Sequence, residues 1–240
     1  AWIQYGGGGA LWEELFARYN IKAFIGGGSG VQAGGWFSKE INSLSDMAGL
    51  RMRIAGYGGE VLARVGGTPV SLPADKLVTE LYSGALDAAE WNGPYADLDF
   101  GFAKLLPYYV QPGFHEPGAT EFIGVNQQFW QGLTTRERAI VEYASRAEAA
   151  FTLGQFRAEN GRALKQLVTE YGARVWAMPQ DVWLQAARMS EEIVAEKADV
   201  DDLGRRIYRS YIRFRAEIAP WSSTSLEAYA LARQRAFSAT

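Results

Sequence analysis

The sequence predicts an α/β fold, and two patterns along the chain support that prediction. Between residues 50 and 92, short segments with strand periodicity alternate with segments of helical periodicity. This order is typical of a largely parallel sheet with helices on its faces. Beyond residue 134 the sequence changes to long helices. The 240 residues, 48% of them hydrophobic, are enough to bury a core in one large domain or two modest ones.

The first half of the chain gives these elements in order. We expect helices at 10–19, 58–65 and 73–82, and strands at 50–54, 68–72 and 85–92. In the first strand, Arg51 and Arg53 alternate with apolar residues, as on a strand with one buried face. An apolar stretch at 21–25 runs into a glycine-rich segment at 26–36. That segment favours equally a flexible turn and a backbone that approaches a ligand closely.

The second half contains fewer strands and longer helices. We expect an apolar stretch at 105–110, a loop at 111–118, strands at 121–126 and 174–178, and helices from 134 onward, at 181–197 and at 203–218. Thr134 and Glu137 form a capping box, which marks the start of the long helical region, and Gly172 ends that region.

Composition excludes several classes of partner. The net charge of -3 and the pI near 5.4 give no general attraction for nucleic acid or anionic lipid. Arg205, Arg209 and Arg213 are therefore interpreted as the solvated face of the last helix. The absence of cysteine excludes disulfides and thiolate metal sites. No apolar run is long enough to span a membrane, and the chain opens without a methionine or a secretory signal, so we expect a fragment or a processed form.

Three familiar catalytic or cofactor motifs do not fit this chain. Residues 28–33 match a relaxed dinucleotide fingerprint, but the residues after them have poor helix propensity, and that motif must open a helix. A serine hydrolase or a zinc site would depend on His115, the single histidine of a chain without cysteine. A lone histidine in a proline-rich loop is more often a structural hydrogen-bonding residue.

Charged side chains at strand ends suggest a ligand site instead. Arg53 ends one predicted strand, and Glu90 and Trp91 end another. The carboxyl ends of parallel strands meet at one edge of a sheet, so we expect these residues to converge there. Guanidinium groups bind carboxylates through paired hydrogen bonds. Oxygen atoms of Glu90, Glu116 and Gln32 suit calcium, magnesium or sodium, although ordinary surface residues and a glycosidase carboxylate pair remain open readings.

At these residues the chain resembles the substrate-binding proteins of tripartite ATP-independent periplasmic (TRAP) transporters, in particular those suited to 2-oxo acids or lactate. The matching stretches are 30–37, 50–54 with 58–60, 66–70, 87–91 with 93–95, and 112–118. The resemblance covers most of residues 1–126, and the helical remainder matches in pattern.

The resemblance implies a cation site. Gln32, Glu90 and the backbone carbonyl of Trp91 would hold the metal, with Glu116 as a further ligand. Calcium or sodium is the expected ion, and the bound acid would complete the coordination.

It also implies a substrate site beside the cation. Arg53 would bind the carboxylate of the acid, and Asn92 and Tyr95 would line the pocket with Gln32 and Trp91. No residue is assigned a catalytic role.

The fold implied by the resemblance has two α/β lobes, joined by crossing strands near 25–32 and 121–126. Residues 1–24 would be a remnant of an incomplete first lobe, 25–122 the second lobe with most of the site, and 123–240 a return to the first lobe with long C-terminal helices. Family members begin with an additional segment that includes the export signal.

The expected function is that of a periplasmic solute receptor, not an enzyme, that delivers a small organic acid to TRAP membrane subunits. The alternative is a metal-dependent enzyme acting on 2-oxo acids, with Glu90 or Glu116 as general base. A structural or protein-interaction module is the third class. We expect no nucleic-acid partner, and the sequence leaves a homodimer open.

Overall fold

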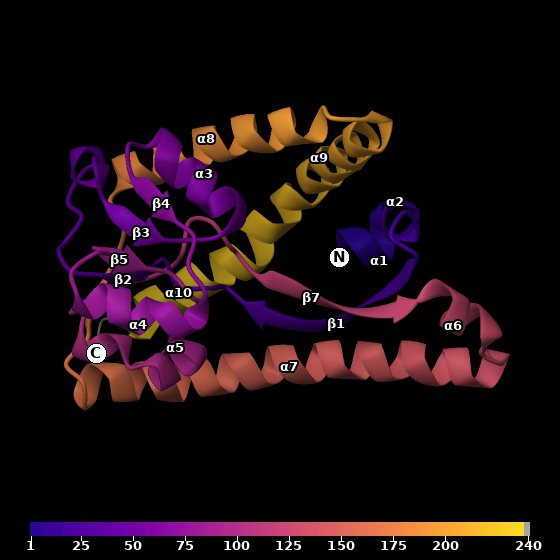
Figure 1. Ribbon diagram of the computed structural model, residues 1–240, viewed down its shortest axis with the longest axis horizontal. Coiled ribbons are helices and arrows are strands. Elements are labelled where there is room, and N and C mark those ends of the chain that lie inside the picture. Colours follow the sequence, from indigo (N-terminus) through magenta and orange to yellow (C-terminus); the bar gives the residue numbers. More distant parts are fainter. Residues whose placement is uncertain (238–240) are drawn as a thin grey trace. The chain divides into compact units, whose positions relative to one another are not determined.

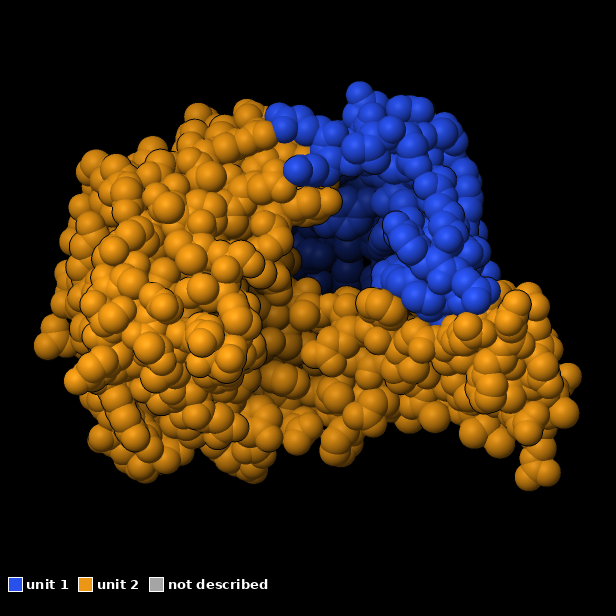
Figure 2. Space-filling model, in the orientation of Figure 1, with its two compact units in different colours: residues 1–22, 195–240 blue, residues 23–194 orange. Residues whose placement is uncertain are grey.

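The computed structural model describes residues 1–237 (Figure 1). These residues fall into two compact units, which Figure 2 colours separately. One unit is formed by both ends of the chain, residues 1–22 and 195–240, and the other by residues 23–194. The predicted α/β architecture lies in the second unit, and the predicted lobe boundaries stay a prediction.

The unit of chain ends is helical. It contains α1 (Trp2–Tyr5), α2 (Gly8–Ala17), the end of α8 (Gln180–Ala198), α9 (Asp202–Ser222), the π-helical turn η3 (Ser223–Glu227) and α10 (Ala228–Phe237). The Trp2 indole donates a hydrogen bond to Ser210 Oγ at 3.2 Å. Arg206 donates two bonds of 2.8 Å to the Glu14 carboxylate. These contacts between residues about 200 positions apart hold the two termini together.

The face of α9 that carries Arg205, Arg209 and Arg213 is exposed, whereas Leu203 on the same helix is buried. The prediction of a solvated arginine face is therefore confirmed. Among residues 1–237, no helix is both long and apolar enough to cross a bilayer.

The unit of residues 23–194 is built on a six-stranded sheet in the order β4-β3-β5-β2-β6-β8. The strands are β2 (Gly35–Phe37), β3 (Arg51–Arg53), β4 (Thr68–Val70), β5 (Ala88–Ala89), β6 (Tyr108–Val110) and β8 (Arg174–Trp176). β3 is parallel to β4 and β5, as the alternation of strands and helices predicts. β2 is antiparallel to both of its neighbours, so the sheet is mixed.

Helices pack on both faces of this sheet. They are α3 (Gly56–Arg64), α4 (Ala74–Tyr82), α5 (Pro94–Phe100), the end of α7 (Thr135–Thr169) and most of α8, with short 3-10 turns η1 (Leu44–Met47) and η2 (Phe102–Lys104). The short helix α6 (Gln127–Gly132) follows β7 (Ala119–Asn126) instead, and its Trp130 packs against Phe24. Neighbouring residues of β2 enter different cores: Phe37 packs with Leu62 of α3 and Val182 of α8, and Trp36 with Leu77 of α4 and Leu167 of α7. This division follows from the two-residue period of a strand.

The first part of the glycine-rich segment, residues 26–30, belongs to a strand and not to a flexible turn. β1 (Ile21–Gly30) pairs with β7 (Ala119–Asn126) in a separate two-stranded sheet. A Cβ atom on Gly26 would lie 2.4 Å from Ile123 Cγ1. Glycine is needed at this position because a side chain would block the approach of β7. The close backbone approach that the glycines allow is therefore to another strand of the chain and not to a ligand.

The long helix α7 begins where the sequence predicts. The Thr134 backbone N–H donates to Glu137 Oε2 at 2.8 Å, and the Glu137 N–H donates to Thr134 Oγ1 at 3.3 Å. The predicted capping box is thus confirmed. Gly172, with φ of +72°, lies just beyond the end of the helix.

Candidate functional site

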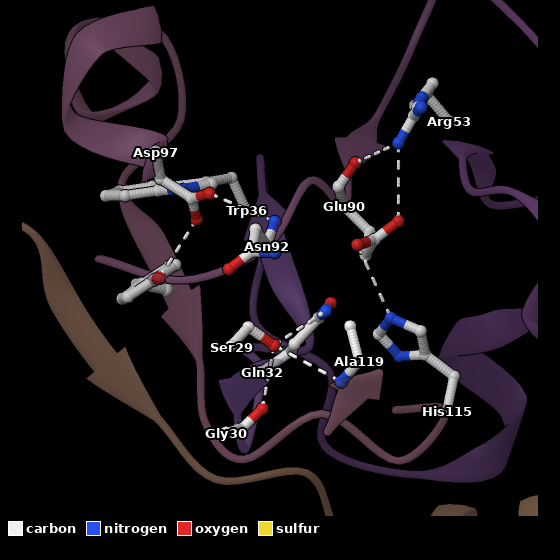
Figure 3. A network of polar contacts seen from close by, with 11 residues as sticks. Ser29, Gly30, Gln32, Trp36, Arg53, Glu90, Asn92, Asp97, His115 and Ala119 are labelled. Carbon is white, nitrogen blue, oxygen red and sulfur yellow. Dashed lines mark hydrogen bonds and ion pairs between the residues drawn. The ribbon is translucent and has the colours of Figure 1, made fainter. Parts of the chain in front are cut away.

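Arg53 and Glu90 are brought together by the pairing of β3 with β5. Arg53 lies beside Ala89 in the parallel register, so the residue after β5 faces the end of β3. Arg53 Nη1 donates a hydrogen bond of 2.6 Å to the Glu90 carbonyl and lies 3.3 Å from Glu90 Oε2. The side chains are only 15% and 6% exposed. The expected convergence of Arg53 and Glu90 is confirmed, and Figure 3 shows their partly buried contact.

His115 reaches the same carboxylate from the loop between β6 and β7. Its Nε2 lies 3.5 Å from Glu90 Oε1, and its side chain is 2% exposed. Neither ring nitrogen has a hydrogen-bond partner among residues 1–237. The structure places His115 beside Glu90, and the interpretation of His115 as a structural hydrogen-bonding residue stays a prediction. The Glu90 carboxylate lies between Arg53 on one oxygen and His115 on the other (Figure 3).

Gln32 follows β1 and is 4% exposed. Its Nε2 donates to Ser29 Oγ at 3.2 Å, and Ser29 Oγ accepts a further bond from the Ala119 N–H at 3.2 Å. The other side-chain atom, Gln32 Oε1, is buried without a partner in the described part of the chain. A buried carbonyl oxygen is costly unless something binds it, so this atom indicates a cation or a donor from a ligand.

Trp91 and Asn92 extend the site beyond Glu90. The Arg53 guanidinium lies 4.9 Å from the centre of the Trp91 ring, a cation–π contact. The Asn92 carbonyl accepts a hydrogen bond of 2.8 Å from the Ala33 N–H. Its side-chain Oδ1 is a further buried acceptor without a partner within residues 1–237.

The two remaining predicted residues are placed differently. The contact of Glu116 with Gln32 is made by its backbone carbonyl, which accepts the Gln32 N–H at 3.2 Å. Tyr95 is 37% exposed and packs edge-on against Phe156 of α7, with ring centres 5.8 Å apart. Neither side chain contributes to the contacts around Glu90 that are described above.

Asp97 is a buried acid next to the site that the sequence does not reveal. Its side chain is fully buried and accepts hydrogen bonds from Trp36 Nε1 at 3.0 Å, Tyr109 Oη at 2.9 Å and the Asn92 N–H at 3.2 Å. Burial raises the pKa of Asp97 to about 7, and burial together with the Asp97 charge also raises the pKa of Tyr109. In the sequence, Pro94 with Asp97 three residues later is typical of the first turn of a helix. That pattern does not indicate that the acid is buried in a hydrogen-bond network.

The donor atoms fit a hard cation. Within residues 1–237, no group of three or more His, Cys, Asp or Glu side chains is placed to hold a metal ion. The site offers instead the Glu90 carboxylate, the Gln32 amide oxygen and backbone carbonyls. Calcium, sodium and magnesium prefer oxygen ligands of this kind, whereas zinc prefers nitrogen and sulfur.

Residues 2–199 match the model of the DctP family, described as bacterial extracellular solute-binding protein, family 7. The chain belongs to this family. The recognition made from the sequence motifs is thereby confirmed, and this is a family of transport solute-binding proteins.

A relative named for 2-oxo acids is among the similar proteins. The chain is 38% identical over 230 residues to a monocarboxylate 2-oxoacid-binding periplasmic protein of Nostoc sp., covering 95% of this chain and 63% of that protein. The chain therefore spans less than two thirds of the length of this relative.

Two solved structures share the fold. A TRAP periplasmic solute binding protein from Pseudoalteromonas atlantica, with bound sodium and pyruvate, matches with a TM-score of 0.88 and 38% identity over 95% of this chain and 70% of its own. A TRAP solute binding protein from Bordetella bronchiseptica matches with a TM-score of 0.93 and 36% identity over 99% of this chain and 70% of its own. It is a mixed-occupancy dimer, with copurified calcium and picolinate in one site and an apo site. The predicted class, the two-lobe α/β fold of periplasmic binding proteins, is confirmed.

Proposed function

We propose that this protein is a periplasmic solute receptor that binds a small 2-oxo or 2-hydroxy monocarboxylate together with a metal cation, for transport by a TRAP system. The observation that carries the proposal is the buried contact between Arg53 and Glu90 at the carboxyl ends of parallel strands. A guanidinium, which suits a ligand carboxylate, beside a carboxylate, which suits a hard cation, supports this proposal.

The cation would be held by oxygen atoms. Gln32 Oε1 and the Glu90 carboxylate are the side-chain ligands, with the Trp91 carbonyl from the backbone. Glu116 is a further ligand in this proposal. Calcium or sodium, the ions bound in the two solved relatives, is the expected metal.

The organic acid would lie against Arg53. The guanidinium uses one nitrogen, Nη1, for both of its contacts with Glu90, so its other N–H groups can bind a ligand carboxylate. Asn92, Trp91 and Gln32 complete the polar and aromatic surroundings, and Tyr95 is included from the family resemblance. Pyruvate, bound by the Pseudoalteromonas protein, is the first candidate.

The membrane subunits of a TRAP transporter are the expected partners. The Bordetella relative, solved as a dimer, supports a homodimer as a further proposal. A metal-dependent enzyme is the rival function, and unchanged recovery of the ligand after binding distinguishes a receptor from it.

Isothermal titration of the metal-stripped protein tests the proposal. Pyruvate, lactate and succinate are titrated with and without calcium or sodium. We expect saturable binding of a monocarboxylate that requires the cation. Absence of binding for every pair would contradict the proposal.

A matched pair of variants on one strand tests the role of Arg53. Arg53→Ala should weaken binding by about 2–5 kcal/mol, because a buried carboxylate would lose its charged partner. Arg51→Ala is the control, since the exposed Arg51 lies two residues earlier on β3 and bonds the Asp87 carboxylate instead. Equal affinity of the two variants would remove Arg53 from the site.

A further inference from the structure

Asp97 joins three separate parts of the fold. Its Oδ2 accepts from Trp36 of β2 at 3.0 Å and from Tyr109 of β6 at 2.9 Å, while Oδ1 accepts the backbone N–H of Asn92 at 3.2 Å. Trp36 and Tyr109 are stacked, with ring centres 4.2 Å apart, and both are fully buried. The two rings therefore fix the Asp97 carboxylate in the core, where α5 packs on the sheet.

One bond of this buried cluster, from the Asn92 N–H to Asp97 Oδ1, leads to the site. Asn92 lies two residues after Glu90, and its carbonyl is bonded to Ala33, the neighbour of Gln32. Asp97 and Ala33 thus hold the Asn92 backbone on both sides. Residues 90–92 carry three groups that the proposed function assigns to the site: the Glu90 carboxylate, the Trp91 carbonyl and the Asn92 side chain.

We infer that Asp97 is a positioning residue for ligand binding, which fixes the backbone of residues 90–92 through the Asn92 N–H. This inference rests on the proposed function. The hydrogen bonds of the Asp97 side chain go to Trp36, Tyr109 and Asn92 and not to Arg53 or Glu90, so it acts by holding a neighbour of Glu90 in place. Trp36 and Tyr109 in turn fix the Asp97 carboxylate.

Two conservative variants separate positioning from simple stabilisation. Asp97→Asn leaves one acceptor oxygen, which satisfies most donors when it faces Trp36 and Tyr109. An NH2 group then replaces Oδ1, and the bond from the Asn92 N–H is lost. Tyr109→Phe keeps the stacked ring and removes one bond to Oδ2, but leaves Oδ1 for Asn92. If Asp97 only stabilised the fold, both variants would be less stable than the unsubstituted protein, but both would bind the ligand with unchanged affinity.

The measurement is titration of each folded variant with pyruvate and calcium at a temperature well below unfolding. We expect Asp97→Asn to weaken binding about tenfold, the equivalent of one buried hydrogen bond, and Tyr109→Phe to weaken it by less than threefold. The inference would be overturned if Asp97→Asn bound with wild-type affinity, or if Tyr109→Phe lost as much affinity as Asp97→Asn. Neither result would affect the proposed function. Failure of the unsubstituted protein to bind any acid would overturn the proposed function, and this inference with it.

Amide hydrogen exchange of the unsubstituted protein provides a second test that needs no variant. The Asn92 N–H should exchange slowly, and more slowly still with pyruvate and calcium bound. Exchange as fast as in exposed loops would overturn the inference, even if Asp97→Asn did not fold.

Discussion

At the scale of single residues, Asp97 makes the stability of the protein depend on pH. Its pKa in the folded protein is raised to about 7 from the ordinary 3.8, chiefly by burial. Between these values the folded protein holds a proton that the unfolded chain releases, so this residue contributes stability that is lost as pH rises toward 7. Relative to Asp97→Asn, which cannot titrate, wild-type protein should lose thermal stability between pH 5 and pH 8. An unchanged difference in melting temperature would contradict this prediction.

The candidate site shows which residues sequence patterns can find. Arg53 and Glu90 are found because parallel strands bring their carboxyl ends to one edge, a rule that needs no tertiary detail. His115 and Asp97 are not found, because their positions depend on packing between distant segments: Trp36 lies 61 residues from Asp97. The sequence shows that His115 is the single histidine, but it does not show which carboxylate the His115 ring lies beside.

At the scale of the elements, the antiparallel strand β2 depends on one glycine. Gly35 has φ of +110°, and a Cβ atom there would lie 2.5 Å from the Ala89 carbonyl oxygen of β5. Gly35→Ala should therefore lower the free energy of unfolding by about 2–5 kcal/mol, from backbone strain and overpacking together.

Gly161→Ala is the matched control for this substitution. Gly161 lies within α7, and a Cβ atom there has nothing within 4 Å. Because alanine favours a helix over glycine, the control should raise stability by about 0.5–1 kcal/mol. Urea unfolding measures both variants, and a Gly35→Ala protein as stable as wild type would show that β2 tolerates a side chain.

Elements were predictable wherever periodicity or end signals are strong. Strands β3 and β4 and helices α3, α4 and α8 follow from local pattern, and α7 from its capping box. β2 was not predicted, because it is three residues long and begins in a glycine run without periodicity. Glycine content alone leaves a flexible turn open at residues 26–36, because it reports backbone freedom and not the partner strand that uses it. The family resemblance places a crossing strand near residues 25–32, and β1 is that strand.

At the scale of the whole molecule, ligand and metal should stabilise the protein only together. A ligand at one hundred times its dissociation constant adds about 2.7 kcal/mol. The site lies in the unit of residues 23–194, so the shift should appear in the unfolding of that unit. Thermal unfolding with pyruvate and calcium should show the shift, and a chelator should abolish it. Stabilisation by pyruvate in the presence of the chelator would contradict a metal-dependent site.

The position of His115 has a practical consequence for following that site in solution. The chain contains one histidine, and its buried ring lies 3.5 Å from a Glu90 carboxylate oxygen. A proton NMR spectrum therefore contains the signals of a single imidazole, with no assignment among several to be made. Any ion or acid that reaches Glu90 changes the magnetic surroundings of that ring, so the unlabelled, unsubstituted protein carries its own spectroscopic reporter of occupancy.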